Sequence, residues 1–310
     1  MANEVSYATL ITDGGRIAKI LAAMLHVNLY DSQTGLRDLM EFRPLTGPSS
    51  TLNVAKVSMA YTAAAASSET SGGASNTALS TGNFDLTPSR YILKMQPTDL
   101  FGITSRGAPV TLETVVAALT LCVDQTLASL LTGLFSGVSG NVGTSGVNMS
   151  ANDFFNGIYT LNLANNPQQL AAVLHNVQVN DLIESIRGEG GAIQFREDIQ
   201  GMFKNPGVAF RGDLLGVKVY QSDKVRTANA GADRQGCMFS QGAFAYTLGD
   251  VAQLLSSSMI NPADIIMQSP EMFIERDRDA ENAMSSMILN MYPGVAEAED
   301  ARAVKITTDA

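Results

Sequence analysis

The side chains most often used in catalysis are scarce in this chain. It has only two histidines, His26 and His175, and two cysteines, Cys122 and Cys237. His175 stands where a predicted buried strand ends and a helix begins, which favours a structural role over catalysis. Both cysteines have apolar neighbours, as expected for buried, reduced thiols. We therefore predict no catalytic residue, no cofactor or cofactor-binding residue, and no metal site.

Two other patterns only superficially resemble ligand-binding motifs. A glycine-rich stretch could be mistaken for a phosphate loop, but it follows a predicted helix and contains no Gly-Lys-Ser/Thr: Gly133, Gly137, Gly140, Gly143 and Gly146. The run Glu-Arg-Asp-Arg-Asp at 275–279 alternates in sign, which indicates ion pairs within the chain or between subunits. The sequence does not indicate an enzyme. An α/β enzyme with an unrecognised site is the remote alternative.

The composition restricts the kinds of partner. The chain has 310 residues, of which 16% are charged, and a formal net charge of −10. Such an acidic chain is a poor candidate for binding nucleic acid by neutralising phosphates, although it could enclose nucleic acid. Low surface charge suggests that much of the surface is buried against partners. The N-terminal residues do not resemble a signal peptide and no apolar run is long enough to span a membrane, so we expect a soluble, intracellular protein.

Hydrophobic periodicity predicts an alternation of helices and strands. The longest helix is expected over 109–135, where Pro109 suits the first turn and an apolar face recurs at helical spacing. Shorter helices are predicted over 16–25, 152–163 and 177–188. Strands are predicted over 169–176 and 213–225, a strand pair or a strand and turn over 236–250, and long strands within 270–294 that return to the long helix.

Residues 60–84 form a low-complexity run of Ala, Ser, Thr and Gly that is too small and polar to build a core. Strand-like segments flank the run on both sides, and in each the apolar residues change face once, as a bulge or a change of neighbour would require. This symmetry favours a long hairpin with its turn near Gly72 and Gly73. A disordered linker is the alternative.

The order of these elements resembles that of tailed-bacteriophage major capsid proteins of the Hong Kong 97-type fold. The most specific stretches are AAVLHNVQVNDLIESI, GDLLGVKVYQSDKV and GCMFSQGAFAYTLGD, followed by ERDRDAENAMSSM and a closing AVKITT. The resemblance implies an α+β fold divided as follows: an N-terminal arm over 1–44, an extended loop over 45–97, a peripheral domain over 98–167 and 263–310 with a spine helix at 109–135, and an axial domain over 168–262.

The resemblance also implies the function and the partners. Subunits would form pentamers and hexamers that close into an icosahedral shell around double-stranded DNA, without sequence-specific binding and without a membrane. The extended loop would lie over a neighbouring subunit. The implied location is the virion, with assembly in the host cytoplasm, and the further partners are a portal and decoration or cement proteins. An encapsulin-type cellular compartment is the main alternative.

Two departures from the family limit what the resemblance implies. Some members cross-link a loop lysine to an asparagine of another subunit, but residues 62–83 contain no lysine, and Lys56 and Lys94 lie in the flanking strands. We therefore expect non-covalent contacts or a cementing protein. Because only about 15 residues precede the first predicted helix, we also expect a separate scaffolding protein, or none.

Overall fold

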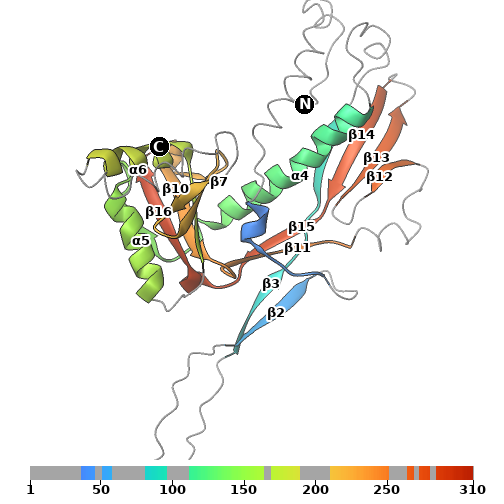
Figure 1. The fold of residues 1–310 in the computed structure, drawn as a ribbon. Coiled ribbons are helices and arrows are strands. Elements are labelled where there is room, and N and C mark those ends of the chain that lie inside the picture. Colours follow the sequence, from blue (N-terminus) through green and yellow to red (C-terminus); the bar gives the residue numbers. More distant parts are fainter. Residues whose placement is uncertain are drawn as a thin grey trace, which may run out of the picture.

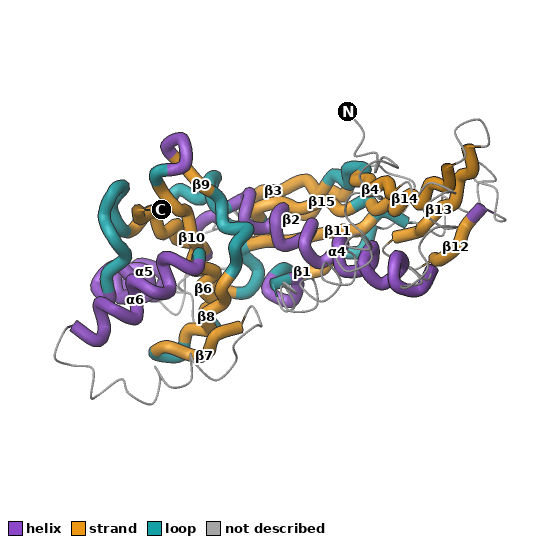
Figure 2. Tube along the Cα trace, turned by 90° about the horizontal axis from the view of Figure 1, so that it is seen from above, coloured by secondary structure: helices purple, strands orange, loops and turns teal. Residues whose placement is uncertain are grey.

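The computed structural model describes residues 36–45, 51–57, 81–95, 112–163, 169–188, 210–250, 264–268, 272–279 and 284–309. They form an elongated molecule with an α/β unit at one end and a small β-sheet at the other, and a long helix runs between them (Figures 1 and 2). The predicted helix at 16–25 and the hairpin turn near Gly72 and Gly73 lie outside the described residues.

The α/β unit contains a seven-stranded sheet and two helices. The strand order is β5-β16-β10-β6-β8-β7, with β9 also paired to β10. Neighbouring strands are antiparallel except for β6 with β8 and β16 with β5. The bounds are β5 Asn141–Val142, α5 Ala151–Leu163, β6 Leu170–Leu174, α6 Asn176–Gly188, β7 Phe210–Leu214, β8 Val217–Gln221, β9 Thr227–Ala228, β10 Asp233–Ser240 and β16 Ala303–Asp309.

Strand β6 is buried along its whole length because both faces of the sheet are covered. Ala172 and Leu174 face a core built with α5 and α6, whereas Val173 faces a second core built with the long helix. This alternation follows from the two-residue period of a strand. A continuous apolar run in the sequence is therefore divided between two cores.

The long helix, α4, spans Leu112–Leu134 and ends against the α/β sheet. Leu127 and Leu131 are fully buried on its inner face, one turn apart. Just beyond the helix, Phe135 packs against Phe239 and Phe244, whose rings lie 6.1 and 5.8 Å from it between centroids. These aromatic contacts join the helix end to strands of two different sheets.

Two smaller sheets continue along the helix. A three-stranded sheet has the order β1-β11-β15, and a four-stranded sheet has the order β12-β13-β14-β4. Met272 and Leu289 from the latter share a core with the long helix, as expected for strands that return to it. The bounds are β1 Glu41–Phe42, β4 Tyr91–Met95, β11 Phe244–Leu248, β12 Ile265–Gln268, β13 Met272–Asp279, β14 Met284–Met291 and β15 Pro293–Glu297, with short 3-10 turns at Arg37–Leu39 (η1), Asn229–Gly231 (η2) and Asp300–Arg302 (η4).

The predicted hairpin is present in the described residues as a two-stranded ribbon. Strand β2, Leu52–Val57, pairs antiparallel with β3, Thr81–Leu86, and the ribbon projects from the body of the molecule (Figure 1). The change of neighbour predicted for the second segment is confirmed, because β3 pairs with β2 whereas β4 pairs with β14.

Two strand predictions need correction. The segment 213–225 is not one strand, because β7 and β8 form a hairpin around Leu215 and Gly216. The two strands in 236–250 do not pair with each other, since β10 and β11 belong to different sheets. The closing strand, β16, pairs with β10 and β5 in the α/β sheet. In each case the arrangement of the strands depends on their pairing partners, which the sequence of one segment does not reveal.

Candidate assembly surfaces

His175 stands at the junction of β6 and α6, and the two cysteines lie in or against the core that includes the long helix. The ring nitrogen Nδ1 of His175 accepts a hydrogen bond from the backbone of Val177, 3.3 Å away, at the start of α6. Burial, and then the charge of Arg234, lowers the pKa of His175. Cys237 is fully buried, and burial raises the pKa of its thiol well above the usual value. Cys122 is half-buried, and neither cysteine forms a disulfide. His26 lies outside the described residues.

In the glycine-rich stretch and the charge run, the described residues make contacts within the chain. Gly143 and Gly146 adopt positive φ angles of 82° and 71° in the loop after α4, and a side chain at 143 would collide with the backbone of Thr307. In the charge run, Glu275 accepts a hydrogen bond from Asn290 at 3.3 Å, and the predicted ion pairs stay a prediction. Within the residues that the structure describes, no group of three or more potential metal ligands occurs.

The ribbon has one apolar and one polar face, which fixes how its root lies on the body. Leu52, Val54 and Phe84 share the apolar face with Leu86, which is completely buried against Ala245 and neighbouring alanines of the three-stranded sheet. On the other face, Asn53 donates to Asp85 across the ribbon at 2.6 Å. The root is therefore anchored by hydrophobic contact, whereas the rest of the apolar face is only partly covered.

The chain between β3 and β4 passes close over the three-stranded sheet. A side chain at Gly294 would meet the backbone carbonyl of Thr87 at 2.7 Å, so only glycine permits this crossing. Beyond the crossing, Arg90 donates from Nε and Nη2 to the side-chain oxygen of the buried Asn290, at 3.2 and 2.7 Å. These contacts fix the point at which the ribbon leaves the body.

Two carboxyl groups meet beside the ribbon root. Burial, together with a hydrogen bond to Asp300, raises the pKa of Glu297, and Lys56 of β2 opposes this rise. Although burial opposes it, hydrogen bonds from Ser139 and from Glu297 lower the pKa of Asp300, and the Ser139 amide donates at 2.7 Å. The pair therefore holds one proton more readily than two isolated carboxyl groups would, with Glu297 as the protonated partner.

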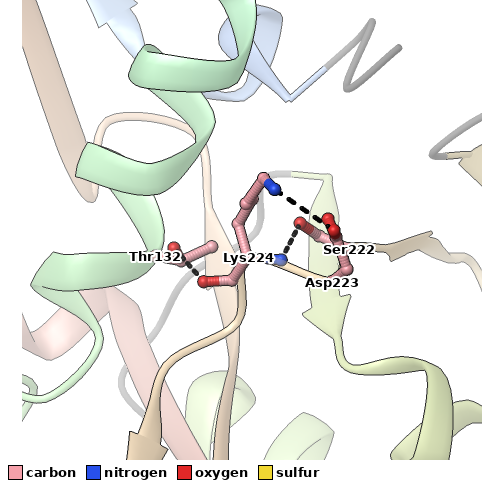
Figure 3. Close-up of polar contacts among 4 residues, drawn as sticks. All are labelled: Thr132, Ser222, Asp223 and Lys224. Atoms are coloured by element: carbon pink, nitrogen blue, oxygen red, sulfur yellow. Dashed lines mark hydrogen bonds and ion pairs between the residues drawn. The ribbon is translucent and has the colours of Figure 1, made fainter. Parts of the chain in front are cut away.

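The long helix is tied to the α/β unit by a buried polar contact. Thr132, which is nearly inaccessible, donates from its hydroxyl to the backbone carbonyl of Lys224 at 2.7 Å (Figure 3). Lys224 lies in the loop after β8, whose shape is fixed by a hydrogen bond from its amide to Ser222 at 3.1 Å. A second tie runs from Arg226 to Ser136 at 2.9 Å. The helix end and the sheet are thus joined on two sides of one loop.

A buried glutamine locks α6 onto the sheet. Gln178 donates to the carbonyls of Arg234 and Ile306 and to the hydroxyl of Thr308, at 3.3, 3.2 and 2.9 Å, and accepts from the amide of His175 at 3.0 Å. Because both polar atoms of the Gln178 side chain have hydrogen-bond partners, burying this side chain leaves no polar group unpaired. Nothing in the local sequence identifies this role, because the three groups to which Gln178 donates lie 56 to 130 residues further along the chain.

The α/β unit also exposes large apolar side chains. Tyr159 and Leu163 of α5 are 64% and 65% exposed, and Leu215 at the β7–β8 turn is 45% exposed. Leu215 and Gly216 both have positive φ, 53° and 80°, the pattern of a type I′ turn, which favours Asn-Gly. A left-handed conformation costs a leucine about 1–2 kcal/mol. The turn is not recognisable in the sequence, because Leu-Gly lacks the usual Asn-Gly or Asp-Gly hairpin signature.

In the part of the chain that the structure describes, no helix is both long and apolar enough to cross a membrane. The sequence matches no protein-family profile and no curated protein.

Solved structures with a similar fold include phage and encapsulin proteins. The chain is similar to the capsid of Ralstonia phage GP4, with a TM-score of 0.61 and 10% identity over 91% of this chain and 90% of that one. It is similar to a chain of Mycobacterium phage Che8, with a TM-score of 0.56 and 15% identity over 83% and 84% of the two chains. It is also similar to the SrpI encapsulin of Synechococcus elongatus PCC 7942, with a TM-score of 0.57 and 12% identity over 90% and 89%. The chain therefore has the Hong Kong 97-type α+β fold.

Proposed function

We propose that this chain is a tailed-bacteriophage major capsid protein, which assembles as pentamers and hexamers into an icosahedral shell around double-stranded DNA. The observation that carries the proposal is the ribbon on this fold. Its root is anchored by Leu86 and Gly294, while Leu52, Val54 and Phe84 on the same face are only partly covered by their own chain. A two-stranded ribbon is marginally stable by itself, so a neighbouring subunit is the natural source of the missing cover.

The division of labour along the chain follows from the same proposal. Residues 1–44 would act as an arm and 45–97 as the extended loop. The spine helix and the four-stranded sheet would form the peripheral domain within 98–167 and 263–310. The α/β sheet around 168–262 would form the axial domain, which also takes in β5, α5 and β16. An acidic chain can line a DNA-filled interior without holding the DNA, which suits packaging and ejection.

The partners and the location are part of the proposal. We expect assembly in the host cytoplasm and residence in the virion, with a portal, decoration or cement proteins, and a separate scaffolding protein where one is needed. Lys56 lies over the ring of Phe84, with its ammonium nitrogen 5.4 Å from the ring centre. This cation–π contact gives that lysine a role within the ribbon, which supports non-covalent contacts rather than a lysine cross-link.

Electron microscopy of purified protein, combined with nuclease treatment and nucleic-acid extraction, tests the function. Closed angular shells, or rings of five and six, are expected, and particles from the native source should contain nuclease-protected DNA. Shells that instead contain a co-purified enzyme and no DNA would indicate an encapsulin compartment. A protein that stays monomeric at high concentration, also when co-expressed with the neighbouring phage assembly genes, would contradict a capsid function.

A further inference from the structure

Two exposed apolar patches of the α/β unit, one on α5 and one at the β7–β8 turn, lie toward opposite ends of its sheet. Helix α5 packs on β16 and β5 at one end, and it carries Tyr159 and Leu163 one turn apart on its outer face. The β7–β8 turn with Leu215 lies at the other end of the strand order. Two different patches at opposite ends of one unit can form a head-to-tail contact, and such a contact generates a ring when the rotation closes.

The outer face of α5 is free of charge. Its exposed side chains are Asn152, Asn156, Tyr159, Thr160, Asn162 and Leu163. The helix contains one Asp and no Glu, Lys, Arg or His, and this residue, Asp153, is half-buried and hydrogen-bonded to Ser150 at 2.7 Å. Copies of a chain with a net charge of −10 repel one another, so they are expected to meet through surfaces without net charge. An uncharged helix face with an exposed tyrosine is typical of an interface.

The β7–β8 turn is suited to the same contact. Asp213 faces Lys218 across the hairpin, so the turn carries no net charge. Leu215 occupies a backbone conformation that leucine adopts with strain, and its side chain is exposed rather than packed within its own chain. Strained residues persist where the strained arrangement is used for function.

We propose that Leu215 of one copy packs against Tyr159 and Leu163 of the next copy, so that α/β units contact one another head to tail around a ring. This inference rests on the proposed shell function and assigns one of its subunit contacts. The partner is a second copy of this chain.

Replacing Leu215 by asparagine separates assembly from folding. Asparagine tolerates the left-handed conformation, so Leu215→Asn should raise the melting temperature of the isolated subunit. The same variant removes the apolar contact, so the subunit concentration needed for assembly should rise about tenfold or more. Tyr159→Ser should weaken assembly similarly and leave the melting temperature unchanged. Val147→Thr, an exposed site of the same unit outside the proposed contact, is the matched control and should assemble normally.

Cysteine pairs test the geometry directly. A chain with both Leu215→Cys and Tyr159→Cys should give, after mild oxidation of assembled particles, a ladder of covalent oligomers up to closed rings. An equal mixture of the two single variants should stop at dimers, and either single variant alone should stay monomeric under denaturing, non-reducing conditions.

The outcomes distinguish this inference from the proposed function. Normal shells from wild type, Leu215→Asn and Tyr159→Ser, without a cysteine ladder, would overturn the contact and leave the function intact. Dimers from one single-cysteine variant would replace the head-to-tail contact by a symmetric one. A wild-type chain that forms neither rings nor shells would overturn both proposals.

Discussion

Replacing Leu86 by alanine should release the ribbon from the three-stranded sheet without unfolding the α/β unit. Leu86 is completely buried at the ribbon root, where its neighbours are mostly alanines and half-exposed side chains. Leucine-to-alanine changes in a core cost about 2–5 kcal/mol, and a site whose neighbours can close in lies at the lower end. We therefore expect a loss of about 2–3 kcal/mol, confined to the ribbon.

Hydrogen exchange of the unassembled subunit measures this loss where it occurs. Since each 1.4 kcal/mol corresponds to a factor of ten, the amides of β2 and β3 should exchange roughly 30- to 150-fold faster in Leu86→Ala. The amides of β6 and β10 should keep their rates. The matched control is Leu174→Ala, another fully buried leucine, which should speed exchange in the α/β sheet and leave the ribbon unaffected. Equal acceleration in both regions for Leu86→Ala would refute the reasoning, because the ribbon would then not be a separate unit of stability.

Three further predictions concern the contacts around the spine and the ribbon root. Gly294→Ala should lower the free energy of unfolding by about 1–3 kcal/mol in urea titrations, because the added methyl group overlaps the crossing backbone; an unchanged midpoint would show that the crossing adjusts freely. Glu297→Gln should be more stable than wild type at neutral pH and equal to it under acidic conditions. The raised pKa of Glu297 makes wild-type stability fall as pH rises from about 4.5 through that pKa, whereas a glutamine amide does not ionise and still donates to Asp300. Thermal melts across pH 4–8 measure this difference, and parallel curves for the two proteins would contradict it. Thr132→Val should cost about 1–3 kcal/mol because it leaves the Lys224 carbonyl unpaired, whereas Thr132→Ser should cost less; equal losses in denaturant unfolding would assign the effect to packing instead.

The sequence predicted those elements whose signal is local. The long helix, the helices at 152–163 and 177–188 and the buried strand at 169–176 all follow from periodicity within one segment, and the structure contains each of them. The ribbon was predictable for the same reason, since two flanking segments with matching patterns surround a run that cannot form a core.

Pairing between distant segments could not be predicted in this way. The sequence at 303–309 has the composition of a strand, but nothing in it shows that its neighbours are β10 and β5. The Leu215-Gly216 turn was missed because leucine is an unusual choice at a left-handed position. The contacts of Gln178 with Ile306 and of Arg90 with Asn290 reach across more than a hundred residues of chain, so no spacing rule reveals them.

The position of β16 within the α/β sheet has a consequence for protein synthesis. Residues 303–309 form the strand between β5 and β10, so the sheet stays incomplete until this late segment has left the ribosome. A chain released early would expose the edge of β10 and could not complete the core around Ile306. We expect such prematurely terminated chains to be removed by proteases rather than added to a growing particle. Only chains translated through β16 can therefore complete the sheet and be incorporated into a particle, and no separate quality-control protein is needed to select them.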